Sequence, residues 1–567
     1  MRLTCYASLL TVALFLEACS GKNSVNTIEN TSERATESKP NIVLIMADDL
    51  GYSDLGSYGG EINTPALDQL AENGLRFTQF YNTARCCPTR AAMLTGLYPH
   101  QAGIGRMTMD AGQPGYRGYL KENTVTVAEV LKEAGYNTGM VGKWHVSPTR
   151  PLAEEDQLEW LAHQQNHETF SDTATYPTAR GFDKYFGNIW GVVDYFDPFS
   201  LVNGKDPVKE VPKNYYHTTA IGDSAVAYVD VFSKEDKPFF LYVAHCAPHW
   251  PLQALPEDIE KYKDTYKVGW DAIREARYQR MLEMGLVDAE TAPMSPRMFP
   301  EKNWEENPDL EWDARAMAVH AAMIERMDKT IGDLVQKLEE TGELENTVIM
   351  FLSDNGASSE RPSRYGPGFD RAGSTRDGKA VIFPVDKDPD AMPGSQTVLS
   401  GIGPEWANVA NTPFRYYKEK PFEGGINTPL IVHWPEQIRN GGTIIQQPGH
   451  VIDIMATVVD LAETSYPQVF EGNNITATEG KSLLPVFEGK QREGHEVLFW
   501  EHFGARAIRK GDWKLVMLDA QADWELYNLA EDRTELNNLA GQFPDKVEEL
   551  AQLWEEMAHE TNVYPLP

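Results

Sequence analysis

The sequence of 567 residues predicts an α/β protein with a large mixed, mostly parallel sheet flanked by helices. Continuous apolar runs, such as Asn41–Met46 and Asn346–Leu352, are typical of strands that are buried on both faces of a parallel sheet. Amphipathic stretches lie between these runs, as expected for helices that connect parallel strands. After about residue 465 the pattern changes to short strands separated by turns. We therefore expect a main domain at residues 40–465 and a smaller C-terminal antiparallel-sheet α+β domain at residues 466–567.

Helices are expected where apolar residues recur at three- and four-residue steps. The clearest case places Ile324, Met327, Ile331, Leu334 and Leu338 on one face, which indicates packing against the sheet rather than a binding stripe. The expected helices are 64–74, 126–134, 223–232, 324–338, 450–461 and 546–559.

The remaining strands are assigned from shorter apolar or β-rich runs. In the main domain they are 138–141, 238–244 and 430–434, and in the C-terminal domain 496–500, 505–509, 513–517 and 524–526. Residues 153–181 and 185–216 are interpreted as loops that either shape a substrate cleft or decorate its rim. The stretch 361–411 is too long for a simple connection, so it is a functional insertion or a disordered one.

The composition indicates a globular protein and limits its partners. Hydrophobic residues make up 41% and charged residues 24% of the chain, as in ordinary folded domains. Lys and Arg number 51 against 84 Asp and Glu, which gives a formal net charge of −33. So acidic a chain repels nucleic acid, and we expect no nucleic-acid partner. Any site for an anion must therefore concentrate positive charge locally.

The N-terminal segment is expected to direct export. Residues 1–18 have a basic start and a short apolar run that cannot span a bilayer, which predicts a signal peptide. The residues around Cys19 resemble a bacterial lipobox, in which Cys19 is lipidated; plain cleavage after Ala18 is the alternative. Residues 19–39 are polar and are interpreted as a tether. We expect an exported protein, a periplasmic or outer-membrane lipoprotein of a bacterium, with a lipid anchor to the membrane.

The cysteines do not form a disulfide framework. Of the five, Cys5 and Cys19 belong to the leader, which leaves Cys86, Cys87 and Cys246. Neighbouring cysteines rarely make a useful bridge. In an oxidising compartment, Cys86 is therefore expected to have a role other than a structural disulfide.

Carboxylates follow two of the expected buried strands. Asp48 and Asp49 end the first run, and Asp354 and Asn355 follow the run at 346–352. Adjacent buried carboxylates are costly unless a cation compensates them, and the carboxyl edge of an open α/β sheet is where ligands bind. A turn or a helix cap is the alternative interpretation for a single Asp.

A thiol and an arginine mark the expected start of a short helix. Pro88 suits the first position of a helix over residues 89–94, which places Cys86 just before its N-terminus, where anions bind. Arg90 adds a cation suited to a carboxylate, phosphate or sulfate. These residues alone are equally compatible with a buried cysteine beside a structural arginine.

Two further strands lead to basic residues. Lys143 and His145 follow the strand at 138–141, and in an extended chain they point to the same side. Such a pair suits an anion and proton transfer. His249, on a rigid turn between Pro248 and Trp250, is a candidate ligand or acid.

The motif Cys86-x-Pro88-Thr89-Arg90, extended by Leu94-Thr95-Gly96, resembles the activation motif of the type I sulfatases, which belong to the alkaline-phosphatase-like superfamily. In that family a formylglycine-generating enzyme oxidises the first cysteine to formylglycine, an aldehyde whose hydrate is the nucleophile. The resemblance assigns this role to Cys86. Cys87 departs from the serine or small residue that is commoner at the variable position.

The resemblance runs from Pro40 to the C-terminus through motifs in the same order and is closest in character to bacterial arylsulfatases. It adds Lys418, six residues before Gly424-Gly425, and it shows Asn427 where an arginine is usual. The implied metal ligands are Asp48, Asp49, Cys86, Asp354 and Asn355. Their oxygens suit Ca²⁺, with Mg²⁺ as the alternative. The implied catalytic residues are Cys86, Arg90, Lys143, His145, His249, Asp354 and Lys418.

The resemblance also implies roles. Asp354 takes a proton from the hydrate, and His145 deprotonates the remaining hydroxyl so that sulfate leaves. Lys143, His249 and Lys418 neutralise developing negative charge, with His249 or Lys418 as the proton donor. Arg90 holds the hydrate and its loop.

These observations predict a sulfuric ester hydrolase of the arylsulfatase type, acting on an aryl sulfate or a sulfated carbohydrate. One alternative is a phosphonate monoester or phosphodiester hydrolase of the same superfamily. The other is a catalytically silent lipoprotein that binds sulfated glycans. The natural substrate, endo or exo action and the oligomeric state are not set by the sequence.

Overall fold

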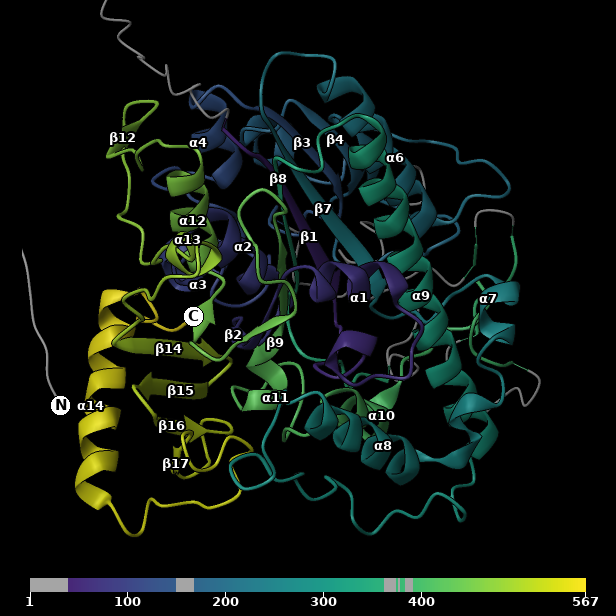
Figure 1. Ribbon diagram of the computed structural model, residues 1–567, viewed down its shortest axis with the longest axis vertical. Coiled ribbons are helices and arrows are strands. Elements are labelled where there is room, and N and C mark those ends of the chain that lie inside the picture. Colours follow the sequence, from purple (N-terminus) through teal and green to yellow (C-terminus); the bar gives the residue numbers. More distant parts are fainter. Residues whose placement is uncertain (1–38, 149–167, 362–373, 376–377, 383–390) are drawn as a thin grey trace, which may run out of the picture. The chain divides into compact units, whose positions relative to one another are not determined.

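The computed structural model describes residues 39–148, 168–361, 374–375, 378–382 and 391–567. Lys39–Pro567 forms one compact unit (Figure 1). The expected signal peptide and nearly all of the expected tether lie outside the described residues, as does part of the loop at 153–181. Among the described residues, no helix has the length and apolar character needed to cross a membrane. The domain boundary placed at residue 465 stays a prediction.

An eleven-stranded sheet forms the centre of the molecule. Its strand order is β10-β2-β9-β8-β1-β7-β3-β4-β5-β6, with β11 paired to β2. Strands β8, β1, β7, β3 and β4 are parallel, whereas β9 runs antiparallel to β8 and β2. The predicted mixed, mostly parallel sheet is confirmed. The strands are β1 (Asn41–Asp48), β2 (Leu75–Tyr81), β3 (Asn137–Gly142), β4 (Lys184–Asn188), β5 (Leu201–Asn203), β6 (Asp206–Pro207), β7 (Phe239–Pro248), β8 (Thr347–Ser353), β9 (Asn427–His433), β10 (Thr443–Ile445) and β11 (Gly449–His450).

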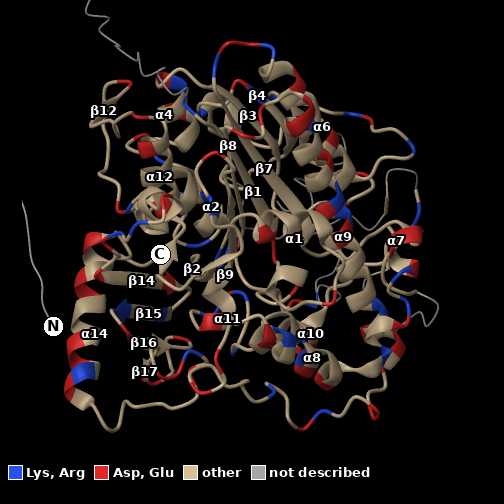
Figure 2. Cartoon of the chain, in the orientation of Figure 1, with Lys and Arg blue, Asp and Glu red and all other residues tan. Residues whose placement is uncertain are grey.

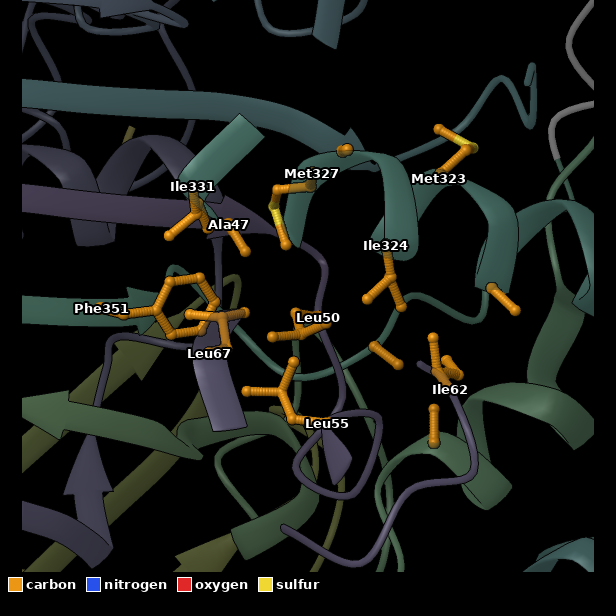
Figure 3. Close-up of a cluster of buried hydrophobic side chains, with 14 of the residues drawn as sticks. Ala47, Leu50, Leu55, Ile62, Leu67, Met323, Ile324, Met327, Ile331 and Phe351 are labelled. Carbon is orange, nitrogen blue, oxygen red and sulfur yellow. The ribbon is translucent and has the colours of Figure 1, made fainter. Parts of the chain in front are cut away.

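Helices cover both faces of this sheet because alternate residues of the apolar strands point to opposite sides. Val43, Ile45 and Ala47 of β1 belong to the core formed with α1 (Pro65–Glu72), α6 (His217–Phe232) and α9 (Leu310–Glu340). Figure 3 shows Ile324, Met327 and Ile331 of α9 in one cluster of buried side chains with Ala47 and Phe351. The apolar face predicted for this helix is buried.

The other residues of β1 pack on the second helical layer. Ile42, Leu44 and Met46 join the core that contains α2 (Cys86–Thr95), α4 (Val127–Glu133) and α12 (Asp453–Leu461). Thr126 caps α4 by accepting a hydrogen bond from the Glu129 backbone N–H.

The C-terminal region forms a four-stranded antiparallel sheet, as predicted. Its strands are β14 (Val497–His502), β15 (Ala505–Lys510), β16 (Trp513–Met517) and β17 (Glu525–Asn528), in that order. One face packs on α14 (Pro544–Glu560) through Trp554. The opposite face packs on Tyr81 of β2 and Ile426 of α11 (Glu423–Ile426) through residues such as Trp500. This sheet therefore packs against the edge of the main sheet through side chains (Figure 1).

The remaining helices and strands complete the described part of the chain. They are α3 (Pro99–Ala102), α7 (Pro256–Glu260), α8 (Trp270–Glu283), α10 (Gly403–Ala410), α13 (Leu484–Phe487), β12 (Val469–Phe470), β13 (Asn473–Asn474) and the 3₁₀ helices η1 (Gly56–Tyr58), η2 (Thr173–Thr175), η3 (Pro177–Ala179) and η4 (Thr265–Val268).

Two local predictions are wrong. Helix α2 begins at Cys86, so Pro88 is its third residue; proline fits there because N–H groups of the first turn have no partner within the helix. The expected loop at 185–216 includes most of β4 and all of β5 and β6, which are too short to give an apolar run. The stretch 361–411, expected to be a functional or a disordered insertion, contains α10.

The acidic residues lie over the outer elements. Figure 2 shows Asp and Glu along α14, α8 and α6. The net charge predicts that positive charge for an anionic ligand is concentrated locally.

Candidate active site

The register of the central strands assembles the site at the carboxyl edge of the sheet. Ala47 of β1 pairs with Ser353 of β8, so Asp48 and Asp49 lie beside Asp354. Asp48 also pairs with Pro248 of β7, which brings the turn that follows β7 to the same edge. Carboxyl ends of parallel strands meet at one edge, and here each is followed by a charged or polar side chain.

Arg90 holds Asp354. Its Nε and Nη2 donate to Asp354 Oδ2 at 3.1 and 2.7 Å, and its Nη1 donates to the Lys143 carbonyl at 3.0 Å. Asp354 Oδ1 accepts from the Asp49 backbone N–H at 3.3 Å. Both side chains are fully buried. The sequence identified Arg90 as a cation suited to a carboxylate, phosphate or sulfate, but it did not show that its partner is Asp354, 264 residues away.

Lys143 reaches Asp48 across the strand ends. The distance from Lys143 Nζ to Asp48 Oδ2 is 2.5 Å. The chain is not extended here, contrary to prediction, because β3 ends at Gly142 with a φ of 93° and His145 has a φ of 57°. A Cβ at Gly142 would lie 1.9 Å from the Ala244 carbonyl oxygen, so only glycine fits the turn.

Lys418 connects the second carboxylate to a histidine. Its Nζ lies 2.8 Å from Asp49 Oδ1 and 3.2 Å from His249 Nε2. His249 Nδ1 is 2.5 Å from the Trp250 carbonyl oxygen, so that nitrogen carries the proton. His249 Nε2 therefore accepts a hydrogen bond from Lys418 Nζ.

Glu360 also lies in this cluster, and the sequence analysis did not identify it. Its Oε2 accepts from Trp250 Nε1 at 2.8 Å and lies 3.3 Å from Lys418 Nζ, while Oε1 is 3.7 Å from Arg85 Nη2. Lys418 and Arg85 hold the pKa of Glu360 below its usual range although burial opposes this. A glutamate six residues after Asp354 in an irregular segment gives no periodic signal.

Cys86 and Cys87 lie beside His145. The two Sγ atoms and a ring nitrogen of His145 are all within 4.8 Å of one another. Hydrogen bonding from Cys87, with the charge of Lys143, lowers the pKa of Cys86 well below its usual value although burial opposes this. Burial raises the pKa of Cys87. Burial lowers the pKa of His145 to about 4, so its ring is neutral at pH 7 and can accept a proton.

The carboxylates are arranged as for a cation. Burial raises the pKa values of Asp48 and Asp354, while Lys418 keeps that of Asp49 below its usual value against the effect of burial. Asp48 Oδ1 and Asn355 Oδ1 are buried, and neither has a hydrogen-bond partner among the described residues. Hard oxygen atoms that lack partners and lie among carboxylates fit Ca²⁺ or Mg²⁺.

The charges of the site balance without a metal. Asp48, Asp49, Asp354 and Glu360 carry four negative charges, and Arg85, Arg90, Lys143 and Lys418 carry four positive charges. These side chains are nearly all buried. A bound divalent cation would leave the cluster with two positive charges, which favours an anionic ligand.

A large cavity in the described part of the chain lies away from this cluster. It has a volume of about 990 Å³, and Phe196, Lys213 and Arg315 are among its lining residues. None of the predicted site residues lines it. A cavity of only about 10 Å³ touches Asp49 and Glu360. The site is identified by its chemistry, since cavity size points elsewhere.

Two family models match the chain, and they overlap at residues 414–464. A model of the family described as Sulfatase matches residues 40–464. A second, described as N-sulphoglucosamine sulphohydrolase, C-terminal, matches residues 414–562.

Individual relatives match over most of the chain. An uncharacterized sulfatase of Schizosaccharomyces pombe is 33% identical, with 94% of this chain and 96% of the relative covered. Arylsulfatase of Klebsiella aerogenes is 32% identical, with 81% and 94% covered. The crystal structure of Ps i-CgsB in complex with k-i-k-neocarrahexaose has the same fold, with a TM-score of 0.62 at 24% identity and with 92% and 93% of the two chains covered.

Proposed function

This chain belongs to the sulfatase family and hydrolyses sulfate esters, and on that premise we propose that Cys86, converted to formylglycine, is its nucleophile beside a divalent cation. One observation carries the proposal. Five separate segments bring a buried cysteine at a helix start together with three carboxylates and three cations at one sheet edge. A structural role for Cys86 would not need such a concentration of charge.

The proposed metal ligands are Asp48, Asp49, Asp354 and Asn355, with an oxygen of the modified Cys86. Carboxylate and amide oxygens in this number favour Ca²⁺, which accepts six to eight oxygen ligands in flexible geometry. The unpartnered oxygens of Asp48 and Asn355 support the assignment. When bound, the cation supplies positive charge that polarises a sulfate oxygen.

Formylglycine supplies, as its hydrate, one hydroxyl that attacks sulfur and a second whose deprotonation releases sulfate. Asp354 is placed to take the first proton, because Arg90 fixes its Oδ2 and burial raises its pKa. His145 is placed to take the second, since its neutral ring lies beside residue 86. A formylglycine-generating enzyme is the proposed partner in maturation.

The remaining cations stabilise negative charge. Lys143 and Lys418 are fixed by Asp48 and Asp49, so they are already in place when charge develops on the sulfuryl oxygens. The hydrogen-bond pattern favours Lys418 over His249 as the proton donor to the leaving oxygen. His249 Nε2 already accepts from Lys418, so it has no proton to give.

The proposed substrates are aryl sulfates or sulfated carbohydrates. The name of the Klebsiella aerogenes relative supports the first class. The match to the N-sulphoglucosamine sulphohydrolase C-terminal family and the oligosaccharide held by the structural neighbour support the second. Export and a lipid anchor at Cys19 remain a proposal from residues 1–39, which radiolabelled palmitate incorporation into wild type and Cys19→Ala would test.

The test of the mechanism is mass spectrometry of the tryptic peptide 86–90, from active protein made in its native host. We expect an aldehyde at residue 86. Chelation should abolish sulfate release, and Ca²⁺ should restore it. Two intact thiols in fully active protein would refute the proposed nucleophile. Catalytic efficiency on an aryl phosphonate should be far below that on the matching aryl sulfate.

A further inference from the structure

Cys87 belongs to a second group of possible metal ligands, which is complete only while residue 86 is still a cysteine. The sulfatase reaction uses Cys86 and His145 but has no role for Cys87. The Sγ atoms of Cys86 and Cys87 and a ring nitrogen of His145 nevertheless lie within 4.8 Å of one another. All three residues are buried, with at most 3% of their surfaces exposed.

His145 provides an independent sign of an absent ligand. Both of its ring nitrogens are buried without an oxygen or nitrogen partner among the described residues, and the group that hydrogen-bonds to the ring is the Cys86 thiol. Its ring packs edge-on against Trp190 at 5.4 Å between centroids and closely against Gly191, which fixes its direction. His249 differs, because both of its nitrogens are engaged. A buried imidazole without an oxygen or nitrogen partner calls for an explanation.

The ligand types select the metal. Thiolate and imidazole ligands suit Zn²⁺, whereas the oxygen atoms of Asp48, Asp49 and Asn355 suit Ca²⁺. Two thiolates on one tetrahedral Zn²⁺ lie about 3.8 Å apart, given Zn–S bonds of about 2.3 Å. Ligand atoms that are already within 4.8 Å need to move only slightly.

We propose that the protein, while residue 86 is still a cysteine, binds one Zn²⁺ ion through Cys86 Sγ, Cys87 Sγ and a ring nitrogen of His145, with water in the fourth position. In the complex, the two thiolates balance the charge of the divalent ion, so the metal-bound pair is neutral. Lys143 can therefore keep its pairing with Asp48. Three protein ligands and an open position are a known arrangement for zinc.

The zinc-bound form would be inactive. Its His145 is occupied, and Cys86 is held as a metal-bound thiolate that is unavailable for conversion. Conversion replaces the Cys86 Sγ by an aldehyde, which removes one of the three ligands. Zinc would thus distinguish unconverted from converted protein, and Cys87 is the residue that creates this distinction.

The experiment uses full-length protein with a thiol at residue 86, made without the converting enzyme and verified by mass spectrometry. Excess Ca²⁺ first fills the oxygen site. Zn²⁺ is then titrated in competition with a chromophoric chelator, and Co²⁺ is used as the spectroscopic probe. We expect one Zn²⁺ per chain and a sulfur-to-cobalt charge-transfer band in the near ultraviolet.

Matched variants identify the ligands. Cys87→Ala should halve the charge-transfer band and weaken zinc binding by more than the roughly 10- to 100-fold that loss of an outer-shell partner costs. Cys246→Ala is the control, because Cys246 is buried beside Asn188, where its Sγ lies 3.2 Å from Asn188 Oδ1. It should bind zinc as wild type does. Converted protein, which keeps only the Cys87 thiolate, should show the same loss of band and of zinc affinity as Cys87→Ala.

Two results would overturn the inference. One is the absence of a charge-transfer band in wild type under excess Ca²⁺. The other is equal zinc affinity of wild type and Cys87→Ala, which would place the ion among the carboxylates. Neither result bears on the proposed sulfatase mechanism, because sulfate release by converted protein is measured separately.

Discussion

Two buried ionic clusters of this molecule have opposite character. One is the active site, and the other, which we call the clamp, joins the C-terminal sheet to the segment after Lys418. In the clamp, Lys514 Nζ lies 2.9 Å from Glu423 and 2.7 Å from Glu535. Glu423 also accepts from Tyr81, and Glu535 accepts from the Glu423 backbone N–H.

The clamp shares one lysine between two glutamates, whereas the active site gathers several carboxylates and cations around atoms that have no hydrogen-bond partner. Among the described residues, Asp48 and Asn355 each keep an unpartnered oxygen, and both ring nitrogens of His145 lack an oxygen or nitrogen partner. Buried polar atoms are normally paired, and groups left over mark places where a ligand is expected. The contrast teaches that burial of charge by itself does not identify a site, whereas unpartnered atoms gathered among carboxylates and thiols at one sheet edge do. The following predictions test that contrast.

The largest expected effect is on activity and not on stability. Cys86→Ala should lower the rate of aryl sulfate hydrolysis by a factor on the order of 10⁴ or more, as loss of a nucleophile does. Its unfolding free energy should change little, because the side chain is small. Sulfate release and denaturant unfolding measure the two quantities. Activity that survives in Cys86→Ala, with Cys246→Ala as the control, would break the assignment of the first cluster.

The next effect is on stability. Lys514→Met leaves Glu423 and Glu535 buried without their shared cation, so we expect a loss of about 3–5 kcal/mol in the free energy of unfolding. Lys546→Met, at a partly exposed pair with Glu549, should change it by at most about 0.5 kcal/mol. Urea unfolding compares the two variants. An unchanged stability in Lys514→Met would show that the clamp is not held by charge.

The contribution of the clamp to the free energy of unfolding should also depend on pH. Burial raises the pKa of Glu535 to about 7, from an unfolded value near 4.5. The folded state then binds this proton more tightly, so its stabilising contribution is present below pH 4.5 and is lost as the pH rises to about 7. The loss can reach about 3 kcal/mol. Glu535→Gln should flatten the stability profile over this range relative to wild type. Parallel profiles would exclude Glu535 as the titrating group.

The smallest expected effect is the stabilisation of the fold by Ca²⁺ bound at the unpartnered oxygen atoms of the active site. Ca²⁺ at 100 times its dissociation constant should stabilise wild type by about 2.7 kcal/mol. Asp48→Asn should lose most of this gain because it removes a charged ligand. Without metal, the variant should be less stable than wild type, because it leaves the Lys143 ammonium buried without its carboxylate. Calorimetry with and without Ca²⁺ checks both statements. An equal Ca²⁺ response in wild type and variant would move the ion elsewhere.

Much of the fold followed from local pattern. The apolar run of β1, the stripe along α9 and the short strands of the C-terminal sheet are properties of neighbouring residues, so the sequence predicted them. The start of α2 and the strands β4, β5 and β6 did not follow, because they are set by contacts with the sheet. Glu360 was missed for the same reason.

The sequence by itself determined which chemical groups this protein has: a cysteine in a helix-start motif, carboxylates after buried strands, and basic residues after others. Only the tertiary structure decided how they are paired. Asp49 meets Asp354 across 305 positions and Lys418 across 369, because strand register brings distant strand ends to one edge. It also decided which polar atoms remain unmatched, since that depends on every element packed around them. The local sequence encodes the chemical groups, but which of their polar atoms lack a hydrogen-bond partner is set only when the chain folds.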